Sequence, residues 1–314
     1  YNAGGAGKCG GSTFAASVPY FTDFETGCGA EWSILRIENS EPARLTKFLG
    51  RHNNSAPTLT LTGLTEGQVY TLGFDLYTID SWDGGNATSG DVFFVMVNGN
   101  TVLRESFSNF GAQSFARAAD EGREHMGFNN SWPESIYRYV EVTFTASNSM
   151  ASLAFGGANL EAVDNESWGV DNVRVQLASD LANPFIHSTT LPSQGSTNYL
   201  ALDMFAVAAS GPLSPAAATN AANWSLREAG PNGTFDDGDD VAINLGAALA
   251  PNNFTGRSVL FTVATGPLPA GRYRFQSGAG LVDTNNSAVA VFTREFAIAH
   301  PVLGRIESPG SDSI

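Results

Sequence analysis

The chain contains many short runs in which apolar and polar residues alternate, and this period of two limits its fold more than any other feature. Residues 140–145 read Val-Glu-Val-Thr-Phe-Thr, and residues 173–177 read Val-Arg-Val-Gln-Leu. Alternation places every second side chain on the same face of a β-strand, which suits strands with one buried face. Gly, Asn, Asp, Ser and Pro separate the runs, and long helical stretches rich in Glu, Lys, Leu and Ala are absent from the sequence. The sequence therefore predicts an all-β fold.

Length and turn residues divide these runs into two domains. The chain has 314 residues, and a domain commonly contains about 100–200 residues. We predict one domain over residues 20–177 and a smaller one over 184–299, joined by a linker at 178–183. An N-terminal extension (1–19) and a C-terminal tail (300–314) complete the chain. Candidate strands lie at 58–61, 69–76, 92–97, 140–146, 152–155 and 170–177 in the first domain, and at 199–207, 223–228, 241–245, 258–263, 271–276 and 294–298 in the second.

Two local signals in the first domain refine this interpretation. Asn98-Gly99 directly follows the run at 92–97 and is the strongest hairpin signal in the sequence. Residues 116–123 combine Arg, Ala and Glu and predict a short helix inside a long loop.

The charge balance excludes some partners. Sixteen Lys and Arg face 31 Asp and Glu, giving a formal net charge of −15. Nucleic acids and anionic membranes attract basic proteins, so neither is expected to bind this chain. No run approaches the roughly 20 apolar residues of a membrane span. The chain begins at Tyr1 without a basic, apolar leader, which removal of a secretory signal or trimming of the chain would both explain.

Two further features fit an extracellular or cell-surface protein. Cys9 and Cys28 are the only cysteines, and we expect a disulfide between them, with two unpaired buried thiols as the alternative. Asn-x-Ser/Thr sequons permit glycosylation without demonstrating it. They occur at Asn53, Asn86, Asn129, Asn165, Asn223, Asn232, Asn253 and Asn285.

The first domain resembles carbohydrate-binding modules of the galactose-binding-like jelly-roll group. Three motifs carry the resemblance: Phe24-Glu-Thr-Gly followed by Trp32, the stretch Leu61-Thr-Gly-Leu-Thr-Glu-Gly-Gln-Val-Tyr-Thr-Leu, and Gly169-Val-Asp-Asn-Val-Arg-Val. The resemblance implies a jelly-roll β-sandwich with a structural calcium where the first segment meets the last strand. Glu25 and Asp171 occupy those places in this sequence.

The second domain resembles the Ig-like modules found along large bacterial surface proteins. Its motifs are Asn223-Trp-Ser-Leu, Asn232-Gly-Thr-Phe-Asp-Asp-Gly-Asp-Asp-Val and Leu268-Pro-Ala-Gly-Arg-Tyr-Arg-Phe. The resemblance implies a smaller Ig-like β-sandwich used for spacing, stiffness and adhesion. Fold analogy alone does not assign a function.

Acidic residues beside tryptophans suggest a calcium site. The motifs Asp80-Ser-Trp-Asp-Gly and Glu166-Ser-Trp-Gly-Val-Asp place carboxylates next to turn glycines. Calcium binds six to eight oxygens, including carboxylates and loop carbonyls. The metal candidates are therefore Glu25, Asp80, Asp83 and Asp171; the alternative is that these acids only shape turns while the tryptophans pack at the edge of the core.

The run Asp236-Asp-Gly-Asp-Asp holds four carboxylates within five residues. A cation or plain solvation would relieve their repulsion, and we favour a solvated hairpin tip. The run is not an EF-hand, because the positions required to be Gly and Glu are Asp237 and Ile243.

Sugar binding and catalysis are weaker interpretations of the sequence. Trp82 and Trp132 each stand beside polar or acidic residues and could stack on a sugar, although buried sandwich tryptophans are commoner. The sequence contains no GxSxG elbow, no HExxH motif and no P-loop. A pair of carboxylates flanking a cleft would be invisible in one sequence, but we expect a non-enzymatic protein.

The terminal segments favour self-assembly. Residues 14–20, with Phe14 and Val18, and residues 302–306, with Val302 and Ile306, could each complete an open sheet edge in a neighbouring copy. Contacts of this head-to-tail kind build filaments. We therefore expect an exported structural subunit of an extracellular fibre or appendage whose partners are copies of itself. The alternative is a carbohydrate-binding adhesin or an accessory module of a larger polysaccharide-active protein.

Overall fold

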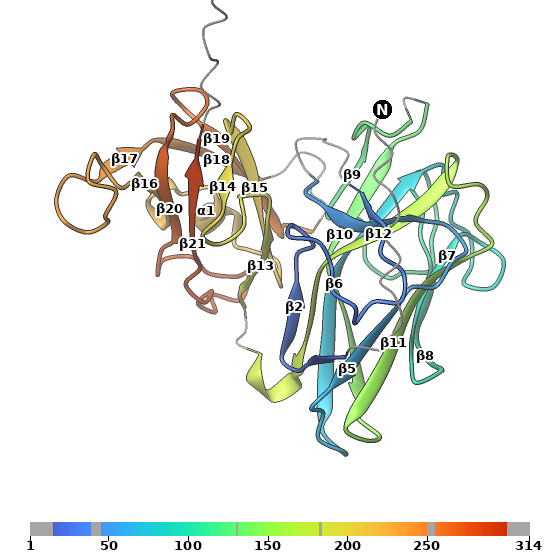
Figure 1. Ribbon diagram of the computed structural model, residues 1–314. Coiled ribbons are helices and arrows are strands. Elements are labelled where there is room, and N and C mark those ends of the chain that lie inside the picture. Colours follow the sequence, from blue (N-terminus) through green and yellow to red (C-terminus); the bar gives the residue numbers. More distant parts are fainter. Residues whose placement is uncertain (1–14, 39–44, 130, 182–183, 250–254, 300–314) are drawn as a thin grey trace, which may run out of the picture.

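Two β-sandwiches lie side by side in the computed structural model (Figure 1). The structure describes residues 15–38, 45–129, 131–181, 184–249 and 255–299. Within these residues, helical structure is limited to α1 (Pro215–Ala218) and the short 3₁₀ turns η1 (Ala178–Asp180) and η2 (Ala221–Asn223). No helix in this part of the chain is long and apolar enough to cross a membrane. The predicted all-β class is confirmed.

The first sandwich packs a five-stranded sheet against a seven-stranded sheet. The first sheet has the order β1 (Ala16–Ser17), β5 (Thr58–Thr62), β11 (Met150–Ala158), β7 (Val92–Val97) and β8 (Asn100–Ser106). The second has the order β3 (Ile37–Glu38), β4 (Phe48–His52), β12 (Glu166–Leu177), β6 (Val69–Asp80), β10 (Glu134–Thr145) and β9 (Glu121–Glu124), and β2 (Tyr20–Thr22) also pairs with β12.

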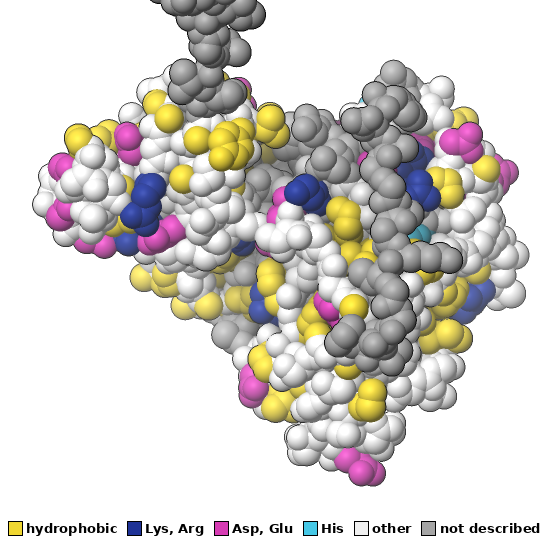
Figure 2. All heavy atoms as spheres, viewed as in Figure 1, with side chains coloured by type: hydrophobic (Ala, Val, Ile, Leu, Met, Phe, Trp, Pro, Cys, Tyr) yellow, Lys and Arg dark blue, Asp and Glu magenta, His cyan; other side chains and the backbone are white. Residues whose placement is uncertain are grey.

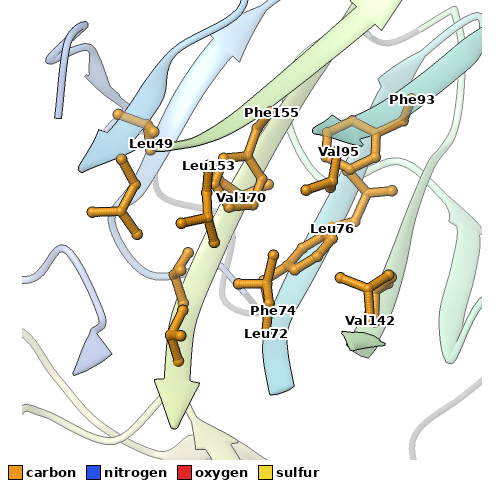
Figure 3. Close-up of a cluster of buried hydrophobic side chains, with 14 of the residues drawn as sticks. Leu49, Leu72, Phe74, Leu76, Phe93, Val95, Val142, Leu153, Phe155 and Val170 are labelled. Atoms are coloured by element: carbon orange, nitrogen blue, oxygen red, sulfur yellow. The ribbon is translucent and has the colours of Figure 1, made fainter. Parts of the chain in front are cut away.

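Alternation along the strands builds the core between these two sheets. Leu72, Phe74 and Leu76 of β6 point inward, and Phe74 contacts the rings of Phe93 and Phe155 on the opposite sheet at centroid distances of 5.8 and 5.5 Å (Figure 3). The residues between them on β6 face the other side of the sheet. That side is also covered, because a smaller apolar cluster forms around Tyr77, Ile79, Leu45, Phe48, Met126 and Ile136. The central strand β6 is therefore buried on both faces.

The second sandwich has its own aromatic core. One sheet has the order β13 (Ile186–Thr189), β15 (Met204–Ala209), β19 (Ser258–Val263) and β18 (Leu245–Leu249). The other has the order β14 (Thr197–Asn198), β21 (Thr293–Ile298), β20 (Gly271–Ser277), β16 (Trp224–Glu228) and β17 (Val241–Ile243). Phe205 stacks on Phe261 at 4.9 Å, and Trp224 stacks on Phe275 at 5.8 Å.

The structure corrects two local predictions. Ala16–Ser17 pairs in parallel with Leu61–Thr62 of the same chain, and Val18 packs against the first core. This part of the N-terminal segment is used within its own sandwich rather than donated to a neighbour. Phe14, Val302 and Ile306 lie outside the described residues. Residues 116–120 form bends and are followed by the strand β9, so the predicted helix at 116–123 is wrong.

Both neighbours of β6 bulge at the level of Asp75. On β10, Tyr137 pairs with Leu76 and Val140 with Phe74, so two residues stand opposite Asp75. On β12, the register shifts between Asp171 and Arg174. Bulged residues leave the ladder and can direct their amide and side-chain groups elsewhere. Here they turn towards the Asp75 side chain.

Gly73, two residues earlier on β6, makes room for this arrangement. A Cβ at Gly73 would lie 2.3 Å from Cε2 of Tyr139, a bulged residue whose φ is +47°. The Tyr139 ring therefore lies directly over Gly73, on the outer face of the sheet.

Candidate functional site

A buried carboxylate, Asp75, forms the centre of an ionic network at the outer face of β6. Its Oδ2 accepts hydrogen bonds from Nη1 of Arg138 at 2.8 Å and Nδ2 of Asn172 at 3.2 Å. Its Oδ1 accepts the backbone N–H of Tyr139 at 2.8 Å. The donors thus come from the bulges on both neighbouring strands. Asp75 has no exposed surface.

Arg138 extends the network to a second acid. Its Nε donates to Oε1 of Glu121 on β9 at 3.0 Å, and its side chain is only 4% exposed. Burial disfavours the charged guanidinium, but Glu121 and Asp75 outweigh this effect and raise the pKa of Arg138 well above its usual value. Burial raises the pKa of Asp75, whereas His187, Arg138 and the Tyr139 amide lower it, and the result lies below the usual range. Asp75 and Arg138 are therefore a charged, fully buried pair.

The second sandwich closes the network. Nε2 of His187 on β13 lies 3.1 Å from Oδ1 of Asp75, and the imidazole is 4.7 Å from the Tyr139 ring. Phe185 meets the same Tyr139 ring edge-on at 5.4 Å. Burial lowers the pKa of His187, although the adjacent Asp75 carboxylate acts in the opposite direction. Tyr139 and Asp75 are thus covered by residues from the other domain.

A second contact between the domains is centred on Asp120, which is fully buried. Its carboxylate contacts Arg117 and the hydroxyl of Thr255, and its Oδ1 lies 3.8 Å from Nε of Arg257. The backbone N–H of Arg138 donates to its Oδ2 at 2.7 Å. Because Thr255 and Arg257 belong to the second domain, Asp120 joins both sandwiches to the Arg138 bulge.

A cleft of about 740 Å³ lies beside this junction. Glu25, Thr46 and Lys47 line it from the first domain, and Thr190 and Ser193 are among the residues that line it from the second. The cleft therefore lies between the first segment of the first domain and the second sandwich.

Two of the four predicted metal ligands meet at the edge of this cleft. Thr46, which lines the cleft beside Glu25, donates to Oδ2 of Asp171 at 3.3 Å. Asp171 is fully buried and accepts the Tyr77 hydroxyl at 2.9 Å. Burial, followed by the charges of Asp75 and Glu25, raises the pKa of Asp171 well above its usual range, and burial also raises the pKa of Glu25. The two carboxyls share a site that disfavours negative charge.

The charge around this pair is only partly compensated. The Lys47 amide donates to Oε1 of Glu25 at 2.7 Å, and the Lys47 ammonium donates to the Glu25 carbonyl at 2.8 Å. Carboxylate and hydroxyl oxygens are the donors that calcium prefers. Glu25, Asp171 and Thr46 therefore fit a calcium ion chemically.

Asp80 lies elsewhere and already has a basic partner. Nη2 of Arg51 donates to its Oδ2 at 2.7 Å, and the amide of Asn129 donates to its Oδ1 at 3.1 Å. Glu134 is its acidic neighbour: one oxygen accepts the Met126 amide, and the other, Oε1, is buried without a hydrogen bond that the described residues supply. Burial raises the pKa of Glu134 to about 7, with a contribution from Asp80. The structure does not bring Asp80 to Glu25 and Asp171.

Asp83 belongs to a third place, the turn between β6 and β7. Its amide and that of Gly84 donate to Asp91, which caps the turn. Burial raises the pKa of the neighbouring Glu166 to about 7, with contributions from Asp91, Glu161 and Asp83. Asp83 itself is exposed and shares no site with the other three predicted ligands.

The two predicted sugar-stacking residues differ. Trp82 is fully buried, and its Nε1 donates to the carbonyl of Ser167 at 2.8 Å, so it lacks the exposed ring that stacking requires. Trp132 is 40% exposed and meets the exposed ring of Phe110 edge-on at 5.6 Å. Only Trp132 of the pair can meet a ligand in solution.

The asparagines of the predicted glycosylation sequons also differ in their burial. Asn223 is buried, and its Nδ2 donates to the carbonyls of Ala217 and Gly280, so the folded chain cannot accept a glycan there. Cys9 and Asn253 lie outside the described residues, and the disulfide to Cys28 stays a prediction. The exposed sequon asparagines are Asn86, Asn232 and Asn285, and the partly exposed ones are Asn53, Asn129 and Asn165.

Sequence reasoning missed Asp75, Arg138 and His187. A signal was present, because Asp75 interrupts the apolar run Leu72-Gly-Phe-Asp-Leu-Tyr of a predicted strand. A charge in a buried strand requires a partner. Nothing in the order of residues indicated that Arg138 and His187 were those partners.

Replacing Asp75 tests how much the network contributes. In Asp75→Asn, the new NH₂ group would face a hydrogen-bond donor whichever of the two carboxylate oxygens it replaced. Arg138 would then have Glu121 as its only remaining acidic partner among these residues. Breaking a buried ion pair costs about 3–5 kcal/mol, and we expect the free energy of unfolding to fall by about that amount in urea titrations. The matched control is Arg272→Gln, which removes a half-exposed pair with Glu295 and should cost about 1 kcal/mol or less. Equal losses in the two variants would contradict the interpretation.

Glu134 gives a prediction on pH dependence. Its pKa in the folded protein, about 7, exceeds the ordinary value of 4.5, so its ionisation destabilises the fold progressively as the pH rises from about 4.5 through 7. Glu134→Gln keeps an acceptor for the Met126 amide and offers Asp80 a donor. We expect the difference in Tm between the variant and the unmodified chain to shift in favour of the variant as the pH is raised from 5 to 8. Glu66→Gln, in an exposed turn, serves as the control; a difference for Glu134→Gln that does not change with pH would overturn the prediction.

Comparison with models of known protein families finds no match, and comparison with curated proteins finds none either. Among solved structures, the N-terminal part of the bacterial S-layer protein SbsC is 18% identical, with 38% of this chain and 24% of that one covered and a TM-score of 0.27. The sugar-binding C-terminal domain of EclA is 16% identical, with 43% and 74% covered and a TM-score of 0.24.

The adhesin domain of Epf from Streptococcus pyogenes is 11% identical, with 79% of this chain and 73% of that one covered and a TM-score of 0.19. The present chain spans about a quarter of the SbsC structure. TM-scores this low carry no argument about fold or function.

Proposed function

We propose that this chain is an exported, non-enzymatic structural subunit of an extracellular surface assembly, in which both sandwiches act as one stiff body. The observation that carries the proposal is the burial of Asp75 and Arg138 beneath His187 and Phe185 of the second domain. A hinge at this junction would expose or unpair those charges each time it opened.

The cost of such an opening supports stiffness. Asp75, Asp120 and His187 have at most 3% of their surface exposed, and each contacts a residue of the opposite domain. Leaving a buried charge or polar group without its partner costs several kcal/mol. Thermal motion therefore rarely separates the two sandwiches, which suits a subunit that transmits force or sets a spacing.

The positions of the acids with raised pKa values support a non-enzymatic role. Glu134 and Glu166, each with a pKa of about 7, have the proton affinity of general acids or bases at neutral pH. Both are almost fully buried, at 1% and 3% exposure. A substrate cannot reach either carboxyl in the folded chain.

Calcium is the structural ion that we propose for the Glu25–Asp171 site. When bound, it would supply positive charge to two carboxyls whose burial otherwise favours protonation. Glu25 and Asp171 would hold the ion, with Thr46 beside them. Because Glu25 also lines the cleft between the domains, the ion would strengthen the same junction.

Assembly is tested with the complete chain. We propose that the tail at 300–314 docks on a neighbouring copy through Val302 and Ile306, and we expect sedimentation and negative-stain micrographs to show elongated multimers. Val302→Ser with Ile306→Ser should leave monomers, whereas Ser311→Ala with Ser313→Ala should assemble like the unmodified chain. A chain that stays monomeric at high concentration, or a double serine variant that still assembles, would overturn the proposal.

One observation favours a carbohydrate-binding role as the second candidate. Phe110 and Trp132 form an exposed aromatic pair, and a pocket of about 290 Å³ begins at the adjacent Gly111. Ser135 also lines this pocket, and its buried hydroxyl has no hydrogen-bond partner within the described residues. Aromatic faces beside hydroxyl groups suit sugar rings.

A glycan array distinguishes this role from a purely structural one. If the exposed pair forms a sugar platform, Trp132→Ala should reduce the signal of bound glycans at least about tenfold, since stacking contributes roughly 1.5 kcal/mol. Tyr199→Ala removes a still more exposed ring, on the second domain, and should leave binding unchanged. Absence of any bound glycan, or equal binding by both variants, would exclude this candidate.

A further inference from the structure

The loop between β16 and β17 projects from the outer end of the second sandwich, away from the first domain (Figure 1). Figure 2 shows acidic and basic side chains gathered at this end of the molecule. The loop contains the four carboxylates of the run 236–240. Three of them, Asp237, Asp239 and Asp240, have ligand oxygens that all lie within 4.8 Å of one another.

The surrounding arginines neutralise only part of this charge. Arg274 forms an ion pair with Asp236 at 2.6 Å, and Arg227 approaches Oδ2 of Asp240 at 3.6 Å. Within the described residues, no ion pair forms at Asp237 or Asp239. The three clustered carboxylates therefore share one distant guanidinium.

Asp240 provides independent support for a missing ligand. Its side chain is only 10% exposed, and it reaches into the cluster, within 4.8 Å of the other two carboxylates. Its Oδ2 accepts the Asp236 amide at 3.1 Å, but its Oδ1 is buried and receives no hydrogen bond from any described residue. A buried carboxylate oxygen without a donor is unfavourable, and a bound cation would stabilise it.

The other two carboxylates point to the same need. Nδ2 of Asn232 donates to Oδ2 of Asp237 at 2.7 Å and to Oδ1 of Asp239 at 3.3 Å, so one amide group serves both carboxylates. The Thr234 hydroxyl also donates to Oδ2 of Asp237. A cation between the three carboxylates, whose ligand oxygens lie within 4.8 Å of one another, would remove their mutual repulsion.

We propose that Asp237, Asp239 and Asp240 bind a divalent cation, and that this cation is calcium. The donors are all oxygens, which excludes metals that prefer sulfur or imidazole. The site lies in a surface turn in which Asp237 is exposed to water. Calcium tolerates irregular coordination completed by water, whereas magnesium demands a near-ideal octahedron. The proposal is separate from the Glu25–Asp171 site and from the assembly role.

Calcium titration of the complete chain tests the site. All measurements use a Glu25→Gln background, which weakens the proposed Glu25–Asp171 calcium site. The calcium binding measured then reports on the Asp237–Asp240 site, whether or not the Glu25–Asp171 site exists. Calorimetry should show binding, and amide NMR signals of residues 230–243 should shift with the same dissociation constant. Asp237→Asn with Asp239→Asn should weaken this binding at least about tenfold.

Asp283→Asn is the matched control, because Asp283 lies in another turn of the same domain and its carboxylate accepts the amides of Asn285 and Ser287. Its calcium affinity should stay within about twofold of the background chain. Unchanged thermal unfolding of the double variant without calcium establishes that the fold is intact. Absence of calcium binding in the background chain, or binding that the double variant retains, would overturn the proposal.

Discussion

The ion pair between Asp75 and Arg138 is the interaction on which the arrangement of both sandwiches depends. A carboxylate at the centre of a buried strand has no water to solvate it, so the neighbouring strands must supply donors. β10 supplies the Arg138 guanidinium and the Tyr139 amide, and β12 supplies Asn172, each from a bulge. The local distortions of the sheet are thus the consequence of satisfying one charge.

The same bulge prepares the surface on which the second domain packs. Tyr139 lies over Gly73, and its ring contacts His187 and Phe185 from the other sandwich. This contact is apolar at its rim and ionic at its centre, an arrangement that water enters with difficulty. The stiffness that we propose between the domains would follow from the charge inside the first domain, since His187 of the second domain completes the enclosure of Asp75.

Local patterns predicted the strands well, because alternation and turn chemistry act over a few residues. The run at 92–97 is β7, and Asn98 and Gly99 adopt the positive φ values, 50° and 80°, that a tight hairpin requires. The strand at 69–76 continues to Asp80, because Tyr77 and Ile79 pack against a second apolar cluster on the outer face. The helix expected at 116–123 does not form. Asp120 is instead held by Arg117 and the Arg138 amide, and Glu121 by the Arg138 guanidinium.

The site was less predictable, because it depends on contacts between distant residues. The motifs that carry the jelly-roll resemblance contain Glu25 and Asp171, and Glu25 contributes to the raised pKa of Asp171; the calcium site itself stays a prediction. Asp80 and Asp83 belong to the same kind of acidic motif. Asp80, however, is paired with Arg51, and Asp83 is exposed and shares no site with the other predicted ligands. The junction of Asp75 with His187 has no local pattern at all, because it arises only when two independently patterned sandwiches meet.

The order of synthesis gives Gly73 and Tyr139 a further significance. The first sandwich leaves the ribosome before the second sandwich is complete, so its Asp75–Arg138 pair is initially open to water at the Tyr139 surface. Water can solvate the charges during that interval, and the arriving second sandwich must displace it. We therefore expect the first domain alone to be less stable than the same domain with its neighbour docked, because His187 then covers Asp75 and Tyr139.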